Sequence, residues 1–431
     1  MSNLRRVVVT GMGAVTPLAN DLETTWERIL AGESGIDLIK IFDASGFATK
    51  IAGEVKDFPF KKWQDFDPLL KDAFRGTFFA LQAAEEALAE SGLKTTDYDA
   101  DRFGVYFAAG DSGTDSDGFA RTLISSSTSD GKVDADLYVQ NAQKYLSGGL
   151  ELESQSFMTV SHLARVFGLR GPVSNCITAC AASLQALGEG FELIKRGDAD
   201  LMLAGGSNSM IYPLGISGFG LLTALSTNNA GPQKASRPFD KTRSGFVMAE
   251  GGGVMVLEEL EHAKKRGAKI YGEIVGQSCT ADAYRLTDMD PEVKGAADAV
   301  TQALRKSGLQ PAEIDYISAH GTSTAVNDAS ETRVIKKVFG DAAKKVPMSS
   351  IKSQLGHMIT ASGVVAAQTC LLAMRDSMLP PTINLNEPDP ECDLDYVPNH
   401  ARKSEVNAAI ANSFGFGGQN VCLVLRKWNE T

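Results

Sequence analysis

Short apolar runs alternate with helical patterns of apolar residues along the whole chain. The runs have the length and composition of buried strands, and they lie at residues 7–10, 102–107, 201–204, 314–319 and 421–425. Helical spacing occurs between and around them, at residues 75–91, 181–196, 291–307, 328–339 and 358–374. Because strands that alternate with helices fold into layers of sheet and helix, the sequence predicts an α/β fold.

The chain is long enough for one large domain or for two fused halves. Of its 431 residues, 43% are hydrophobic, and no proline- or serine-rich linker interrupts it. The charged segment 257–269 has no core stripe of its own, so we place a boundary there, between an N-terminal half (1–258) and a C-terminal half (259–431). Residues 111–149 are rich in Ser, Asp and Gly, and we expect them to form an exposed excursion.

Composition excludes several classes of function. The net charge of −11 repels phosphate backbones, so we expect no nucleic-acid partner. No apolar stretch approaches the roughly 20 residues of a membrane span, and the apolar run near the N-terminus is too short for a signal peptide, so we expect no membrane insertion. The six cysteines lie far apart except for Cys176 and Cys180, which argues against a disulfide framework. A cytoplasmic location is the simplest expectation.

Cys180 directly precedes one of the helical patterns. The apolar residues that recur in this pattern are Leu184, Leu187, Phe191 and Ile194. Cys180 is therefore expected at a helix N-terminus, where the dipole and free backbone N–H groups lower the pKa of a thiol below its usual value of about 8.5. Such a thiolate is a good nucleophile, although a cysteine between alanines is also compatible with core packing. Cys176 is expected to be structural.

His320 follows an apolar run and enters a loop of Gly, Thr and Ser. A histidine at a strand end is placed for acid–base work, and a histidine that is hydrogen-bonded in the core explains the pattern equally well. Glu331 stands three residues after Asp328, the spacing of a capping box, which favours a structural role at a helix start. The local pattern alone leaves both alternatives open.

Lys352 and His357 form a further cluster, in KSQLGH, just before a helix with several small residues. A lysine near a histidine beside a buried helix is harder to explain by solvation than a lone lysine. Near the C-terminus, Phe414, Gly415 and Phe416 lie in SFGFGGQN. So many glycines favour unusual backbone angles or close approach to a ligand, and a tight turn requires them as well.

Two cofactor sites are rejected on spacing. The segment VVVTGMGAVTP lacks the third glycine of a dinucleotide fingerprint, which excludes a nicotinamide site. Four residues could in principle ligate a zinc ion, but the spacing of the two cysteines and their helical context do not support such a site. They are Cys176, Cys180, His320 and His357. We therefore expect no metal.

Several motifs, in one order and at long spacings, resemble the β-ketoacyl synthase family of the thiolase fold. They are TAC ending at Cys180, RPFDKTRSGFVMAEGGG from Arg237, AHGTST with His320, KSQLGH with Lys352 and His357, and SFGFGGQN. The likeness runs from about residue 7 to 425 and is closest to the type II elongating enzymes of fatty acid synthesis. It implies two pseudo-repeated α/β halves in a five-layered αβαβα body, with the nucleophilic cysteine in the first half and the histidines and lysine in the second.

The resemblance implies a decarboxylative condensation. Cys180 would accept an acyl group from an acyl carrier protein, with the backbone N–H groups of Cys180 and Phe416 holding the oxyanion. His320 and His357 would stabilise the enolate that forms when malonyl carrier protein loses carbon dioxide. Lys352 and Glu331 would maintain the polar network behind them.

Further roles come from the resemblance alone. It implies an arm-binding pair, Thr322 and Thr324; a gate, Phe416 with Gly415 and Phe414, facing a loop with Asp282; an acyl pocket with Asp111 and Phe219; and a carrier-protein patch at Lys61, Lys62, Lys71 and Arg75. The only prosthetic group implied is the phosphopantetheine arm of the carrier, so no cofactor is expected. The family arrangement is a homodimer.

Four departures from the family pattern affect the expected specificity. Ala325 stands where proline is usual, Arg285 where histidine is common, and Thr223 where arginine often meets the carrier. Asp111 stands where a bulky apolar residue often lines the acyl pocket, which makes a long saturated chain a poor default substrate. The alternatives are a dedicated secondary-metabolite ketosynthase working as a heterodimer, a non-catalytic chain-length-factor-like subunit, and a thiolase or starter synthase that uses coenzyme A thioesters.

Overall fold

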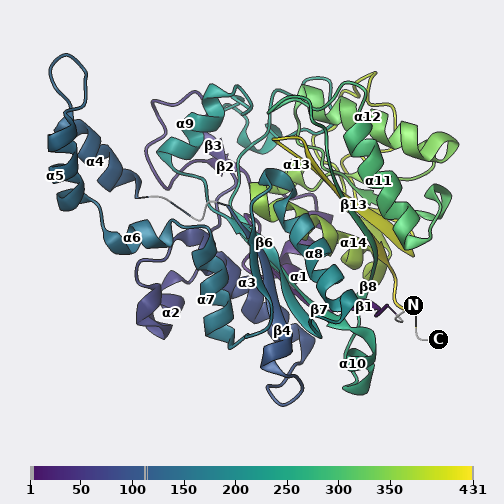
Figure 1. Cartoon of the computed structure of the whole chain (residues 1–431). Coiled ribbons are helices and arrows are strands. Elements are labelled where there is room, and N and C mark those ends of the chain that lie inside the picture. The colour runs from purple at the N-terminus through teal and green to yellow at the C-terminus, as the bar shows by residue number, and fades with distance from the viewer. Residues whose placement is uncertain (1–3, 111–112, 114, 430–431) are drawn as a thin grey trace.

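The computed structural model describes residues 4–110, 113 and 115–429 (Figure 1). Ten strands form one hydrogen-bonded sheet in the order β10-β9-β13-β14-β8-β1-β7-β6-β4-β5. The strands of the N-terminal half are β1 (Val7–Val15), β4 (Phe103–Ala109), β5 (Val173–Cys176), β6 (Leu201–Asn208) and β7 (Gly251–Glu259). Those of the C-terminal half are β8 (Gly272–Ala281), β9 (Tyr316–Ser318), β10 (Met348–Ser349), β13 (Ala408–Gly415) and β14 (Gln419–Arg426).

The two halves repeat one strand arrangement. From the outer edge of the sheet inward, the first half has the order β5-β4-β6-β7-β1 and the second half has the order β10-β9-β13-β14-β8. When the five strands of each half are numbered along the chain, both orders are 3-2-4-5-1. The pairings repeat as well, since β4 is parallel to β5 and β6, β9 is parallel to β10 and β13, and β7 and β14 run antiparallel to their neighbours. Antiparallel pairing of β1 with β8 joins the halves. The predicted boundary at 258/259 falls at the last residues of β7 and stays a prediction.

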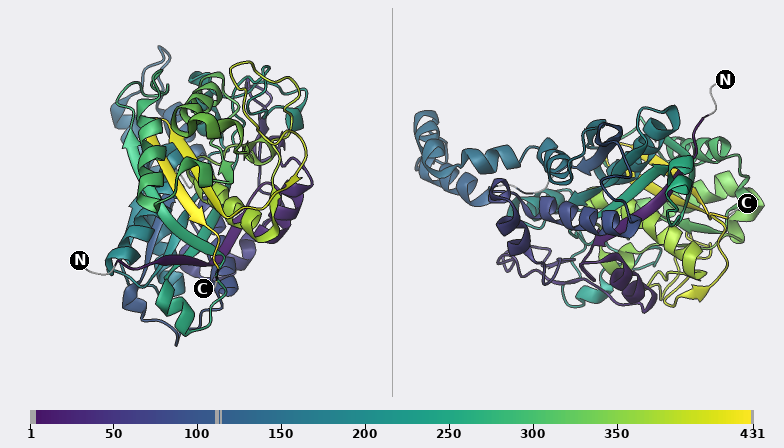
Figure 2. Two further views of the ribbon diagram at one scale, coloured as in Figure 1. Left: turned by 90° about the vertical axis from the view of Figure 1, so that its right-hand side faces the viewer. Right: turned by 90° about the horizontal axis from the view of Figure 1, so that it is seen from below.

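Helices cover both faces of this sheet (Figures 1 and 2). Helix α8 (Ala182–Arg196) packs on α14 (Ser362–Asp376) in the middle, and both contact strands of both halves. Helix α3 (Arg75–Ser91) packs on β1 and β7, and α11 (Lys294–Ser307) packs on β8 and β14. Helix α14 is buried along nearly all its length, as expected for the central layer of the predicted five-layered body.

The glycines of the first strand serve packing. A Cβ at Gly11 would lie 2.0 Å from the carbonyl oxygen of Ala87, and one at Gly13 would lie 2.2 Å from that of Ala83. Only glycine lets α3 lie so close to β1. The glycines of VVVTGMGAV therefore have a structural reason that requires no nucleotide.

Two predicted helix starts are wrong by about one turn. Helix α12 spans Ala325–Phe339 because Thr324 is its N-cap, whose side chain accepts the N–H of Asn327. Helix α11 begins at Lys294 rather than 291. The predicted helix 358–374 begins as a 3₁₀ turn, Ile359–Ala361, before α14.

The Ser- and Gly-rich excursion is helical rather than irregular. It forms α4 (Ser116–Ser126), α5 (Ala135–Tyr145) and α6 (Gly148–Glu153), which project from the body in Figure 1. Helix α10 (Leu260–Lys265) buries Leu260 and Ala263, so the segment 257–269 does have a small core face, contrary to expectation.

The remaining helices are α1 (Leu22–Leu30), α2 (Phe60–Phe66), α7 (Phe157–Phe167), α9 (Pro213–Leu221) and α13 (Lys352–Leu355). Short strands pair β2 (Asp37–Leu38) with β3 (Ile51–Ala52) and β11 (Met378–Leu379) with β12 (Arg402–Lys403). Within the described ranges, none of the helices has the length and apolarity needed to cross a membrane.

Candidate active site

Three buried side chains from separate segments converge at the ends of the central helices. The Sγ of Cys180 and one ring nitrogen each of His320 and His357 lie within 4.8 Å of one another. Cys180 lies in a 3₁₀ turn that leads into α8, as predicted, His320 follows β9, and His357 follows α13. The two imidazole rings meet edge to face, 5.5 Å apart.

Burial dominates the ionisation of Cys180. It raises the pKa of the thiol, while the backbone N–H of Phe416 and the positive charge of Lys352 act in the opposite direction. The predicted lowering of this pKa is therefore wrong for the resting site, because loss of solvent outweighs the helix N-terminus. The backbone N–H groups of Phe416 and Cys180 lie close enough to the sulfur to counteract part of this rise in pKa, so they stand beside the atom at which an acyl group would be attached.

Both histidines are held neutral. Burial, and after it the positive charge of Lys352, lowers the pKa of His320 and of His357 well below the usual value. Nδ1 of His357 lies 2.9 Å from Oγ of Ser362, at the start of α14. When that hydroxyl donates to Nδ1, the ring carries its proton on Nε2, a buried atom with no hydrogen-bond partner among the described residues.

Lys352 and Glu331 fix the backbone at His320. Nζ of Lys352 donates to the carbonyl oxygen of His320 at 2.6 Å. Glu331 accepts the N–H groups of His320 and Gly321 at 2.9 and 2.8 Å. Burial lowers the pKa of Lys352 and raises that of Glu331, and their mutual attraction opposes both shifts. The capping-box interpretation of Glu331 is wrong, because its carboxylate leaves its own helix and supports the loop that carries His320.

A pocket leads from the surface to Cys180. Its lining includes the predicted residues Phe219, Asp282, His320, Thr322, Thr324, His357, Phe414, Gly415 and Phe416. It also includes Phe246, Asn327 and Ile359, which the sequence analysis did not single out. Phe246 lies in the motif from Arg237 and packs edge to face on His357 at 5.3 Å, so the motif was the available signal.

Aromatic stacking closes one side of the pocket. The ring of Phe416 stacks on Phe219 at 6.4 Å, and Gly417 donates its N–H to the carbonyl oxygen of Leu286 at 2.6 Å. Gly417 and Gly418 have φ of +85° and +76°, angles that favour glycine. The predicted gate and its facing loop are thus in direct contact.

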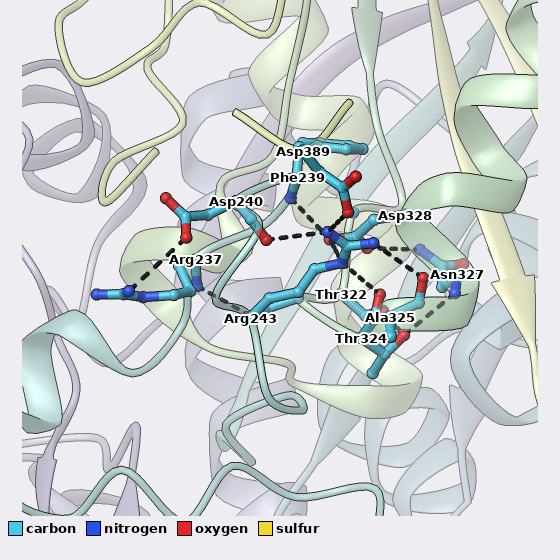
Figure 3. A network of polar contacts seen from close by, with 12 residues as sticks. Arg237, Phe239, Asp240, Arg243, Thr322, Thr324, Ala325, Asn327, Asp328 and Asp389 are labelled. Atoms are coloured by element: carbon cyan, nitrogen blue, oxygen red, sulfur yellow. Dashed lines mark hydrogen bonds and ion pairs between the residues drawn. The ribbon is translucent and has the colours of Figure 1, made fainter. Parts of the chain in front are cut away.

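A buried arginine holds the loop with the threonine pair (Figure 3). Arg243 donates to the carbonyl oxygens of Thr324 and Ala325, both at 3.0 Å, and pairs with Asp389 at 2.5 Å. Asp328 lies 3.7 Å from the same guanidinium. Thr322 and Thr324 share a hydrogen bond of 2.9 Å at the pocket wall. Arg243 lies in the motif that begins at Arg237, and the sequence alone gave no sign of this role.

Two family models together match most of the chain. "Beta-ketoacyl synthase, N-terminal domain" matches residues 4–263, and "Beta-ketoacyl synthase, C-terminal domain" matches residues 271–386. The chain belongs to the β-ketoacyl synthase family.

Relatives and solved structures agree along the full length. The "3-oxoacyl-[acyl-carrier-protein] synthase 2" of Coxiella burnetii is 43% identical over 424 residues, covering 98% of this chain and 99% of that protein. The protein of the same name from Synechocystis is 42% identical, covering 99% and 100%. A solved complex titled "AntDE:AntF (apo): type II PKS acyl-carrier protein in complex with its ketosynthase bound to the hexaketide" superposes with a TM-score of 0.88 at 35% identity, covering 99% of this chain and 100% of that one.

Some predicted residues of this family member lie away from its pocket. Asp111 falls outside the described residues. Among the residues of the predicted carrier patch, Lys61, Lys62 and Lys71 do not line the pocket, and Lys62 pairs with Glu85. Arg75 is not a free surface cation, because its guanidinium pairs with the fully buried Glu250. Arg75 therefore has a structural role, and the carrier role of Arg75 and of the lysines stays a prediction.

The same three atoms of this β-ketoacyl synthase could coordinate a metal ion. A thiolate and two imidazoles suit zinc, but a closed structural site takes a fourth ligand. Cys176 does not supply it, since its Sγ lies 3.3 Å from the carbonyl oxygen of Ala182. The four-residue zinc set considered from the sequence is therefore not assembled.

Proposed function

We propose that this chain joins an acyl group held on Cys180 to the carbanion of malonyl-[acyl carrier protein], giving β-ketoacyl-[acyl carrier protein] in fatty acid biosynthesis. The observation that carries the proposal is the approach of Cys180, His320 and His357 to within 4.8 Å at the end of the pocket. The full-length relatives named 3-oxoacyl-[acyl-carrier-protein] synthase 2 support the same reaction.

Acyl transfer comes first. The thiol of Cys180 loses its proton, and its sulfur attacks the thioester carbonyl of the acyl carrier. The backbone N–H groups of Cys180 and Phe416 face this sulfur and are suited to hold the oxyanion. Losing one such donor typically lowers a rate by about 10²–10³. The intermediate collapses to an acyl-enzyme, and the carrier leaves as its thiol after taking up a proton.

Decarboxylation and condensation follow. When malonyl carrier enters, neutral His320 and His357 can each donate an N–H to its thioester oxygen. The bond to the carboxylate breaks, carbon dioxide leaves, and the electron pair becomes an enolate whose charge lies on that oxygen. The enolate carbon then attacks the acyl carbonyl and releases the sulfur of Cys180. Two neutral donors suit this step because they stabilise a negative oxygen without transferring a proton to it.

The partners follow from the chemistry. Acyl and malonyl carrier proteins deliver the substrates on a phosphopantetheine arm, for which Thr322 and Thr324 supply polar contacts in the pocket wall. The reaction balances without a metal or organic cofactor. We propose a homodimer. Retention of the nucleophile in the pocket argues against a non-catalytic chain-length-factor role.

Intact-mass spectrometry tests the proposal. Wild type and Cys180→Ala are each incubated with a panel of acyl carrier proteins, and malonyl carrier is then added. We expect a mass increase confined to wild type, followed by its loss and the appearance of β-ketoacyl carrier. An equal adduct on Cys180→Ala, or acylation without condensation, would contradict the proposal.

A further inference from the structure

Exposed apolar side chains lie at, or next in the chain to, residues that line the mouth of the pocket. A depression continuous with the pocket shares Thr324, Val326 and Phe416 with it and is also lined by Leu222. We define the apolar rim as Leu222 and Val326, which line the depression, together with Leu221 and Leu286, which adjoin the lining residues Leu222 and Thr287 in the chain. Leu221 is 86% exposed and Leu286 is 83% exposed, while the other two are about half exposed. So much apolar surface at one opening is typical of an interaction site.

The rim carries little free positive charge. Arg243 is the one cation among the described residues that line the pocket and the depression. Its guanidinium is only 4% exposed and is compensated by Asp328 and Asp389. Next to the rim, Arg285 pairs with Asp288 at 3.2 Å. Thr223, at the position where the family resemblance implies an arginine, adds no charge.

The route of the substrate dictates what covers this surface. If the acyl group arrives on a protein-bound arm, the arm must pass through the mouth, and the protein that carries it must then lie against the rim. Exposed leucines are stabilised by removal from water, whereas compensated charges contribute little to the attraction of an acidic partner.

We propose that the acyl carrier protein docks on the apolar rim by hydrophobic contact instead of on cations at the mouth. The carrier that fits presents apolar side chains beside the attachment point of its arm. The inference rests on the proposed function, and it adds the chemistry by which the partner is recognised.

Leu221→Asp and Leu222→Asp test the rim. The KM for Cys180 acylation is measured with two donors, an acyl carrier protein and the acyl thioester of N-acetylcysteamine, which lacks the protein. We expect KM for the carrier to rise at least about tenfold, while that for the small thioester stays within about twofold, because burying a charge opposite an apolar face is unfavourable. The matched control is Leu4→Asp, at a leucine that is 63% exposed near the N-terminus.

Salt dependence distinguishes docking on the apolar rim from docking on cations, including the lysine patch predicted from the sequence. Between 0.05 and 0.5 M NaCl, we expect KM for the carrier to change by less than about twofold, because salt screens charge pairs and leaves apolar contacts intact. Thr223→Arg adds a cation to the mouth and should make the KM of that variant rise with salt for an acidic carrier. A steep rise of KM with salt in wild type would overturn the inference.

The remaining outcomes of these measurements either overturn the inference or contradict the proposed function. Equal losses with both donors would mean that the leucines support the pocket itself, and no change with either donor would mean that the carrier docks elsewhere; each result overturns the inference. A change of oligomeric state by light scattering, with KM unaltered, would assign the rim to contact between synthase chains and overturn it too. Failure of wild type to accept acyl groups from both donors would instead contradict the proposed function.

Discussion

Lys352 donates to the carbonyl oxygen of His320 at 2.6 Å, so one buried ammonium both orients a histidine and sets the electrostatics of the site. After burial, its positive charge is the next cause that lowers the pKa of His320 and of His357, and the same charge opposes the rise that burial causes in the pKa of the Cys180 thiol. A neutral residue here would change all three groups at once.

Lys352→Met should slow condensation and move its acid limit. Without the ammonium, the pKa of each histidine rises, so the rings become protonated at a higher pH and the acid limb of the rate profile shifts upward. The lost bond to a buried carbonyl costs about 1–3 kcal/mol, which corresponds to a rate lower by roughly 5- to 150-fold when the transition state bears that cost. Steady-state rates between pH 5 and 9 measure the shift. Lys345→Met, at an exposed lysine, is the control, and an unshifted acid limb would refute the prediction.

Cys180 should react faster as pH rises, without a plateau near neutrality. Burial raises the pKa of this thiol, so the thiolate fraction is small at pH 7 and grows with pH. The measurement is the rate of alkylation by iodoacetamide from pH 6 to 10, followed by intact mass. Cys180→Ser supplies the background from other cysteines, and a plateau below pH 7 would contradict the prediction.

Glu331→Gln should destabilise the loop that carries His320. The carboxylate accepts two backbone N–H groups, and an amide offers one oxygen and one NH₂, so one buried donor loses its partner. We expect the free energy of unfolding in urea to fall by about 1–3 kcal/mol. Glu405→Gln, at an exposed residue, is the matched control and should stay near wild type. Equal stability of the two variants would argue against the support role.

Arg243→Lys should separate charge from geometry at the mouth. Lysine keeps the positive charge but cannot bond the carbonyl oxygens of Thr324 and Ala325 together with Asp389 as the planar guanidinium does. We expect KM for the acyl carrier to increase more than kcat decreases, because the loop with the threonine pair loses its support. Arg170→Lys, at an exposed ion pair, serves for comparison. A loss in kcat alone would place Arg243 in the chemistry instead.

The sequence predicted elements whose signals are local. Helix α3 has the predicted bounds because its apolar stripe is continuous and Gly92, at φ +63°, ends it. The start of α12 was wrong because Thr324 caps it while the next residues look like loop. The order of the motifs predicted which side chains converge, and the distances among Cys180, His320 and His357 agree with that.

What the sequence could not show depends on tertiary contacts. The role of Glu331 depends on which loop lies over its helix, and Ser362 matters only because the chain brings it to Nδ1 of His357. The pKa of Cys180 was predicted with the wrong sign because burial is a property of the assembled fold. The sequence could single out Lys61, Lys62, Lys71 and Arg75 as candidate cations, but it could not show that Arg75 is paired with Glu250.

The repeated strand arrangement distributes the active site between two bodies. The nucleophile precedes α8 of the first half, and both histidines lie in the second, so neither half holds a complete set of reacting groups. If the chain were divided in the connection between β7 and β8, neither fragment alone would catalyse the condensation. Activity would return only when the fragments associate. The condensation rate of co-expressed fragments would therefore be proportional to the amount of reassembled enzyme, and it would measure assembly directly.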